Sequence, residues 1–173
     1  EDFVNDPVVC RERLEAHVEA DSPFAIEMLA CMHQQGRLGL VKDSREAARL
    51  FRRAAKLGKP RANVRLGLLK LEGCRGVRQD EAGALAAFLN AAKQGDAYGQ
   101  YLAGRLLLDD GDARRAIALW EAAADQGLGA AAAALGAIYD RGEGVARNLA
   151  MAAIWYSEAA DHGDEIAAER LEE

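Results

Sequence analysis

The sequence contains no threonine, only three serines and few aromatic residues, which form 6% of its 173 positions. Threonine and aromatic residues are typical of strands, whereas the alanine, leucine, arginine and glutamate that dominate this chain favour helices. The composition therefore predicts an all-α protein. No apolar run approaches the roughly 20 residues of a membrane span, and no signal-peptide pattern is present, so we expect no membrane insertion. Because the chain starts at Glu1 rather than at a methionine, the earlier removal of a targeting segment is an open alternative.

The sequence also lacks the patterns that catalysis, metal binding and phosphate binding require. It contains no HExxH, CxxC or P-loop motif, and its three histidines are scattered along the chain. Its serines fall at predicted helix starts or inside a helix, where they form no recognisable pair with a general base. We therefore expect no catalytic residue, no metal site and no cofactor.

The net charge of −6 is unevenly distributed along the chain. Residues 37–80 carry 13 basic and 4 acidic side chains, whereas the regions on both sides are acidic. A basic band can bind nucleic acid, but here the total charge is negative and no aromatic residues alternate with the cations to stack on bases. We therefore expect no nucleic-acid partner, and an acidic protein partner fits the band better.

Four segments of the chain repeat one pattern, and each ends on a glycine. They are REAARLFRRAAKLG (45–58), AGALAAFLNAAKQG (82–95), RRAIALWEAAADQG (114–127) and AMAAIWYSEAADHG (150–163). In each, a first alanine is followed four residues later by an aromatic residue and three residues after that by a second alanine. This spacing places the three columns on one face of a helix. The segments are therefore predicted to be helices with a shared buried face, each followed by a glycine in the left-handed conformation.

Each of these helices has a predicted cap and a preceding helix. The caps are Asp43, Asp80, Asp112 and Asn148, four residues before the first alanine. Glu46 follows Asp43 at the spacing of a capping box. The preceding helices centre on a leucine and a small residue, at Leu29-Ala30, Leu66-Gly67, Leu102-Ala103 and Leu135-Gly136. Each unit is therefore a helix, a loop and a capped second helix.

Five consecutive alanines, Ala130 to Ala134, precede the leucine of the fourth unit. They could form a disordered linker, but the repeat continues without interruption through Tyr139 and Gly142. Alanine favours helix and lets a neighbouring helix approach closely. The run is therefore predicted to be part of a packed helix.

The repeated pattern resembles the Sel-one-like repeat (SLR) family, whose members are related to tetratricopeptide repeats. The stretch LGAIYDRGEGVARNLAMAAIWYSEAADHG looks like a nearly complete copy of that repeat, and LGLLKLEGCRGVRQDEAGALAAFLNAAKQG is similar. The resemblance implies a right-handed α-solenoid, a superhelix of about four helix-turn-helix repeats with terminal capping helices. It places a single domain over residues 1–173, with a capping helix in 1–22, repeats at 23–60, 61–96, 97–128 and 129–164, and a last helix in 165–173.

The resemblance also implies a non-enzymatic scaffold that binds a partner protein or peptide, often in bacterial envelope assembly, secretion or signalling. Two alternatives stay open. One is a β-lactam-binding or β-lactam-hydrolysing enzyme like some cysteine-rich relatives, although this chain lacks their regularly paired cysteines. The other is an accessory module of a larger bacterial envelope protein. Neither the identity of the partner nor the oligomeric state follows from the sequence.

Two surfaces are candidates for partner binding, and the first is the concave side that tetratricopeptide geometry would create. It would be lined by first-helix positions, namely Phe24, Glu27, Arg61, Leu68, Leu71, Gln100, Leu107 and Arg141. Several of these are apolar, as a groove for a peptide or a helix requires. The alternative is that the three leucines pack against adjacent first helices.

The second candidate surface is the polar face of segment 45–58. Arg45, Arg49, Arg52 and Lys56 follow one another at spacings of four, three and four, opposite the buried columns. Glu46 is the only acid on this helix, so we expect the stripe to be poorly neutralised. The stripe is either a solvated face or a site for an acidic partner.

The three cysteines raise the question of a disulfide. Helices predicted over about 7–20 and 23–35 form an antiparallel pair that turns near residue 21, which brings Cys10 and Cys31 to similar heights. The two are either small buried residues or a disulfide, with Cys74 left as a free thiol. A disulfide would indicate an oxidising compartment, so we favour a bacterial periplasm or secretion, with the cytoplasm as the alternative.

Overall fold

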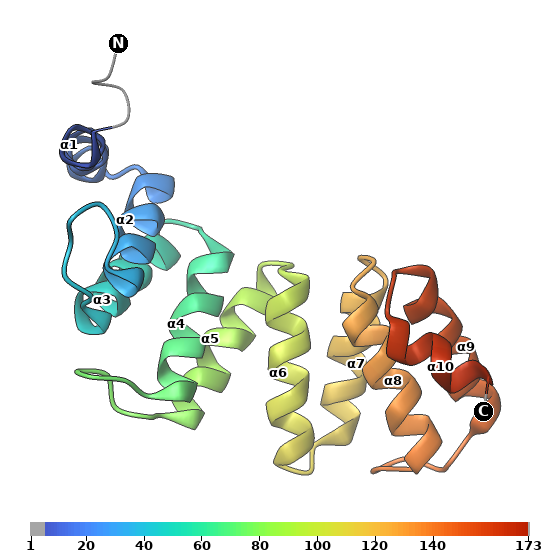
Figure 1. Cartoon of the computed structure of the whole chain (residues 1–173). Helices are drawn as coiled ribbons and strands as arrows, with labels where there is room; N and C mark the ends of the chain where they lie inside the picture. The colour runs from blue at the N-terminus through green and yellow to red at the C-terminus, as the bar shows by residue number, and fades with distance from the viewer. Residues whose placement is uncertain (1–5, 173) are drawn as a thin grey trace. The chain divides into compact units, whose positions relative to one another are not determined.

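The structure is a computed structural model of the whole chain, and it describes residues 6–172 (Figure 1). The helices are α1 (Pro7–Glu19), α2 (Pro23–Gln35), α3 (Ser44–Lys56), α4 (Pro60–Glu72), α5 (Glu81–Lys93), α6 (Ala97–Asp109), α7 (Ala113–Ala124), α8 (Gly129–Arg141), α9 (Leu149–Asp161) and α10 (Glu165–Glu172). Within residues 6–172, the β pairing is one isolated bridge between Cys74 and Val77. The all-α prediction is confirmed. The predicted terminal helices also included residues 1–5 and 173, which lie outside the described residues.

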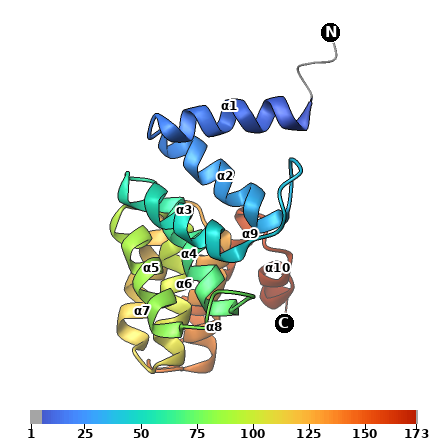
Figure 2. The ribbon, with the colours of Figure 1, turned by 90° about the vertical axis from the view of Figure 1, so that its left-hand side faces the viewer.

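The chain divides into two compact units, one ending at Ala87 and the other beginning at Phe88, inside α5. In the first unit, α2 packs against α1 and α3, and α3 also packs against α4. Figure 2 shows the end of α1 turning directly into α2. The largest fully buried side chains in this unit's core are Ile26, Leu50 and Phe51.

In the second unit each helix from α6 to α10 packs against the next one along the chain. Trp120, Leu135 and Ile138 are the large side chains of its core. Ala131 and Ala132 are fully buried within α8. The run of alanines is therefore packed helix, as predicted.

The repeated columns form the buried faces of the second helices. The fully or almost fully buried members are Ala47, Ala84, Ala116 and Ala152, then Phe51, Phe88 and Trp120, then Ala54, Ala91, Ala123 and Ala159. Tyr156, the last aromatic, is partly exposed. The closing glycines Gly58, Gly95, Gly127 and Gly163 have φ between 81° and 84°, in the left-handed region that was predicted. The predicted columns are confirmed.

The four predicted caps accept hydrogen bonds from first-turn backbone N–H groups. The capping oxygens belong to Asp43, Asp80, Asp112 and Asn148. The predicted capping box is wrong, because the Asp43 N–H donates to the His33 carbonyl at 2.9 Å instead of to Glu46. The Glu46 carboxylate accepts from Arg49, which lies one turn further along α3.

The register predicted for the first helix of the third repeat (97–128) is wrong by one residue. The indole N–H of Trp120 donates to the Tyr101 carbonyl at 3.0 Å, and the ring lies against Gly104, where a Cβ would come within 2.7 Å of the ring Cδ1. In the fourth repeat (129–164) Gly136 faces Tyr156 in the same way. The pair equivalent to Leu135-Gly136 is therefore Ala103-Gly104, one residue beyond the predicted Leu102-Ala103.

Candidate functional site

The predicted stripe on α3 lies in solvent. We call Arg45, Arg49, Arg52 and Lys56 the α3 basic stripe, and all four are exposed. The opposite face of α3 carries Phe51, which is fully buried in the first unit's core. Because the apolar face holds the helix in place, the stripe contributes little to packing and is available to other molecules.

The stripe is better neutralised than the sequence indicated, because Glu46 engages one of its members closely. Arg49 donates from Nε to Glu46 Oε2 at 2.8 Å and from a terminal nitrogen to Oε1 at 2.6 Å. These hydrogen bonds hold the pKa of the Glu46 carboxyl below its ordinary value. Arg52 and Lys56 form no ion pair within residues 6–172. The open charge of the stripe therefore lies toward the C-terminal end of α3 and at Arg45.

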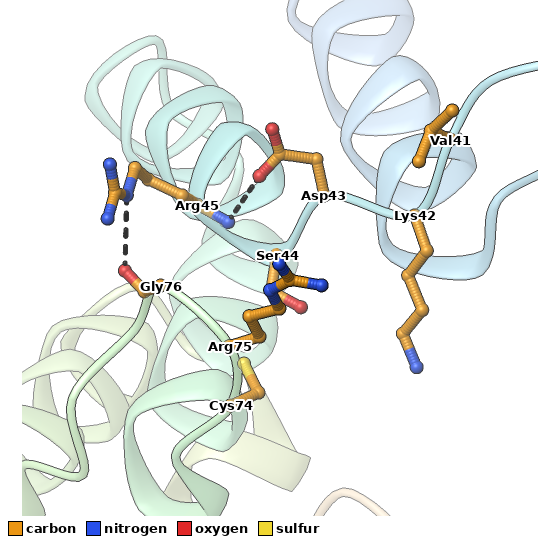
Figure 3. Close-up of a pocket in the computed structure, with 8 residues that line it drawn as sticks. All are labelled: Val41, Lys42, Asp43, Ser44, Arg45, Cys74, Arg75 and Gly76. Atoms are coloured by element: carbon orange, nitrogen blue, oxygen red, sulfur yellow. Dashed lines mark hydrogen bonds between the residues drawn. The ribbon is translucent and has the colours of Figure 1, made fainter.

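Arg45 also lines a pocket at the start of α3, which we call the loop pocket. It is a half-open cavity of about 700 Å³ between the α2–α3 and α4–α5 loops (Figure 3). Its lining residues are Val41, Lys42, Asp43, Ser44, Arg45, Cys74, Arg75 and Gly76. In Figure 3, Arg75 lies between Arg45 on one side and Lys42 on the other.

A tight turn in the α4–α5 loop shapes one wall of the loop pocket. Cys74 and Val77 exchange backbone hydrogen bonds of 2.9 and 2.8 Å, which places Arg75 and Gly76 at the tip of the turn. Gly76 has φ +89°, a conformation that only glycine adopts without strain. A Cβ at this position would come within 3.3 Å of the Arg45 side chain. The glycine therefore lets its own carbonyl accept the Arg45 Nε–H at 3.4 Å.

The charges that line the loop pocket are mainly positive. Lys42, Arg45 and Arg75 supply three cations, and none of them forms an ion pair among the described residues. Asp43 is the one acid in the lining, and its Oδ1 already accepts the backbone N–H groups of Arg45 and Glu46 at 2.9 and 3.0 Å. These backbone hydrogen bonds, chiefly the one from Glu46, lower the pKa of the Asp43 carboxyl. The pocket is therefore a basic cavity whose only carboxylate is occupied by helix capping.

Sequence reasoning found Arg45 but missed Lys42 and Arg75. The available signal was their place in equivalent loops of successive units, one residue before the cap Asp43 and one residue before Gly76. Loops in equivalent positions of neighbouring repeats lie close together when the repeats stack.

In the first unit, the predicted concave positions combine an exposed aromatic ring with cations. Phe24 is 61% exposed, and Lys59 Nζ lies over its ring at 5.6 Å from the centroid. Arg61 is exposed, whereas Glu27 is partly buried. The predicted leucines of this unit, Leu68 and Leu71, are also partly buried. The accessible part of this surface therefore centres on Phe24 and Arg61.

In the second unit, two of the three predicted concave positions are buried. Leu107 is 3% exposed, which favours the alternative that it packs between helices. Gln100 is 8% exposed, and its side-chain oxygen accepts from Gln126 Nε2 at 2.8 Å. Arg141 is exposed and donates to Glu143 at 3.4 Å. Gln100 and Leu107 therefore offer little surface to a partner.

The three cysteines lie in different elements, and each is partly buried. Cys10 belongs to α1 and Cys31 to α2, whereas Cys74 lines the loop pocket. Burial raises the pKa of the Cys31 thiol, and the positive charge of Arg65 partly opposes that rise. The pairing of Cys10 with Cys31 stays a prediction.

Residues 6–172 contain neither a cluster of metal-ligating side chains nor a membrane-spanning helix. No group of three or more His, Cys, Asp or Glu side chains in this part of the chain could hold a metal ion. No described helix is long and apolar enough to cross a membrane.

The comparisons with known proteins identify the repeat. The Sel1 repeat family model matches residues 23–59, 60–96, 97–128 and 129–164. These matches begin at Pro23, Pro60, Ala97 and Gly129, which supports Ala103-Gly104 as the equivalent pair in the third unit.

Solved structures of similar proteins share this fold. A protective antigen of uropathogenic Escherichia coli strains, described as having an SLR fold, matches with a TM-score of 0.83 and 32% identity over 92% of this chain and 35% of that one. A Sel1 repeat protein from Oxalobacter formigenes matches with a TM-score of 0.78 and 30% identity over 88% of this chain and 63% of that one. The predicted fold class, an α-solenoid of four helical repeats, is confirmed.

Two curated relatives are fungal proteins named chitin synthase regulator SKT5. The one from Malassezia restricta is 30% identical over 160 residues, and the one from Saccharomyces cerevisiae is 31% identical over 150 residues. These alignments include 86% and 83% of this chain but only 11% and 22% of the regulators. The chain therefore matches a limited part of each regulator.

Proposed function

Because the chain belongs to the Sel1 repeat family, we propose that it is a non-enzymatic scaffold that binds an acidic partner protein through its first unit. Proteins built from this repeat are typically protein-interaction scaffolds, so the general class follows from the family. The proposal adds the surface and the charge of the partner. The observation that carries it is the α3 basic stripe, in which Arg52 and Lys56 are exposed and have no ion pair within the described residues.

The exposed part of the predicted concave surface, on the first helices of the repeats (α2 and α4), supplies a second contact. Large aromatic side chains and arginines account for much of the binding energy at protein interfaces, and Phe24 and Arg61 are both exposed. Lys59 lies over the Phe24 ring and adds a further positive charge to this surface. An acidic segment that also carries apolar side chains would fit such a surface.

The names of the fungal relatives support the same class of function. A regulator acts on another protein, and two relatives are named as regulators of chitin synthase. The present chain matches only a small part of each, so we propose from them a regulatory interaction with another protein and no particular target.

The proposed function is tested by affinity capture from lysate of the source cells, with quantitative mass spectrometry and four versions of the full chain. They are the wild type, a stripe variant (Arg52→Glu with Lys56→Glu), a first-helix variant (Phe24→Ala with Arg61→Glu) and a charge-matched control in the second unit (Arg105→Glu with Arg114→Glu). Circular dichroism establishes that all four are folded.

We expect one or more acidic proteins to be captured by the wild type and the control, and their recovery to fall by about tenfold with the stripe variant, because reversing contact charges across an interface weakens binding. The first-helix variant should lower the recovery of the same proteins. Equal recovery with all four versions would refute the proposed surfaces.

A further inference from the structure

We propose that the loop pocket binds side-chain carboxylates of an acidic peptide segment in the partner protein. The inference rests on the proposed function for the source of that segment. It goes further in assigning a specific cavity, in which Lys42, Arg45 and Arg75 are the recognising residues.

The state of the cations in the pocket is the first argument. Two other basic side chains of the first unit that reach beyond their own helix have acidic partners: Arg53 pairs with Asp21, and Lys70 pairs with Asp80 at 2.9 Å. The three pocket cations face one cavity and have no such partner within residues 6–172. Grouped like charges raise each other's free energy, and an anion in the cavity would relieve that repulsion.

The shape of the pocket is the second argument. Arg45 comes from the start of α3 and Arg75 from the α4–α5 turn, and in Figure 3 the Arg45 guanidinium lies beside Gly76 whereas that of Arg75 lies beside Ser44. The hydrogen bond from the Arg45 Nε to the Gly76 carbonyl joins the two walls and restricts that side chain. Guanidinium groups bind carboxylates with two parallel hydrogen bonds, a geometry that ammonium groups do not provide.

The lining also indicates which anions fit the pocket. A cavity of about 700 Å³ has room for several side chains of a peptide and is larger than a single small anion needs. No aromatic residue lines it, so a nucleotide base would find no stacking platform. Val41, the exposed apolar residue of the lining, is 85% exposed, which suits the apolar part of a peptide.

The continuity of the pocket with the α3 basic stripe favours an extended segment over an isolated anion. Arg45 belongs to both, and beyond the Arg49–Glu46 pair the open positive charge of α3 resumes at Arg52 and Lys56. A single phosphate would use the pocket alone. An acidic stretch of several residues would place one end in the pocket and continue along the exposed face of the helix.

The test measures binding of a fluorescein-labelled hexaglutamate peptide to the full chain by fluorescence polarisation, with a labelled hexaserine peptide as the probe control. The pocket variant is Lys42→Gln with Arg75→Gln, which removes both charges and keeps a polar, though shorter, side chain at each position. The matched control is Arg105→Gln with Arg114→Gln in the second unit, and a stripe variant is Arg52→Gln with Lys56→Gln. Melting curves establish that the variants are folded.

We expect saturable binding of hexaglutamate and none of hexaserine, with an affinity that falls as salt is added, because the contacts are partly screened. The pocket variant should lose at least about tenfold in affinity, since two charge-assisted hydrogen-bonding groups are removed. The second-unit control should stay within about twofold of the wild type.

Three results would overturn the pocket proposal. One is equal affinity of the wild type and the pocket variant, and another is an equal loss in the second-unit control, which would indicate non-specific charge attraction. The third is displacement of hexaglutamate by inorganic phosphate at concentrations where chloride has no effect, which would assign the pocket to phosphate. If the stripe variant alone loses affinity, the pocket proposal fails while the proposed scaffold function stands.

Discussion

Replacing Gly104 by alanine should destabilise the second unit, although alanine is the better helix former. A Cβ on Gly104 would lie 2.7 Å from Cδ1 and 2.9 Å from Cε2 of Trp120, and closer still to Nε1. The indole cannot easily move away, because it is 2% exposed and its N–H donates to the Tyr101 carbonyl. In the fourth repeat, Gly136→Ala would bring a Cβ to 2.6 Å from two ring carbons of Tyr156, but that ring is partly exposed and can shift outward.

The two substitutions therefore differ in whether the neighbouring ring can yield. Glycine to alanine in a helix gains about 1 kcal/mol from backbone entropy. Overfilling a packed core costs about 1–3 kcal/mol, and breaking the indole hydrogen bond adds about 1 kcal/mol. For Gly104→Ala we expect a net loss of about 1–3 kcal/mol in the free energy of unfolding. For Gly136→Ala we expect a change within about 1 kcal/mol of zero, because the helix gain offsets the smaller packing cost.

Urea unfolding followed by tryptophan fluorescence measures both effects, because Trp120 and Trp155 lie in the second unit. Ala118→Gly, at an exposed position in the middle of α7, serves as the control for helix propensity and should cost about 1 kcal/mol. If Gly104→Ala is as stable as the wild type or more stable, the close contact between Gly104 and Trp120 is wrong. The register that aligns Ala103-Gly104 of the third repeat with Leu135-Gly136 would then also be wrong.

Three further predictions concern the cores, the cysteines and the caps. Leu66→Ala and Leu135→Ala should each cost about 2–5 kcal/mol in urea unfolding, because both leucines are buried; a loss under about 0.5 kcal/mol at both would contradict their place in the core. If the protein is exported, mass spectrometry of unreduced, alkylated protein should find Cys10 joined to Cys31, and three alkylated thiols would exclude that bond. Asp43→Ala should lower the melting temperature at neutral pH. Because the pKa of the Asp43 carboxyl is lowered in the folded state, its stabilisation is present above the ordinary aspartate pKa and is lost as the pH falls through the lowered value, so the two melting temperatures should converge in acid.

The second helix of each repeat could be predicted because the same pattern of buried positions recurs in all four repeats. The 4 and 3 spacing at Ala47, Phe51 and Ala54 recurs in three more segments, and a pattern of that kind has one structural explanation, a helix with one buried face. The caps followed from the same comparison, since a side-chain oxygen is needed where the first-turn N–H groups lack partners.

The register of the first helix of the third repeat, α6, could not be predicted in this way. Leu102 and Ala103 are both apolar and both buried, at 6% and 0% exposed, so hydrophobicity does not decide which of them aligns with the leucines of the other units. The position of Trp120 decides it, because a large ring needs a glycine opposite. The ring's place against Gly104 is known only from the packed structure.

The sequence by itself determined the helices, their buried faces, their ends and the basic band, because each depends on neighbours within a few residues along the chain. The loop pocket was decided by tertiary structure, although the sequence shows that its two loops occupy equivalent places in successive repeats. Lys42 and Arg75 are far apart in the sequence and belong to no repeated column. They line one cavity because packing of the first unit's helices brings the α2–α3 and α4–α5 loops together, and the carbonyl of Gly76, next to Arg75, then accepts a hydrogen bond from Arg45. Local sequence sets the charge of each side chain, but only the folded chain sets the distance between them, and charges interact according to that distance.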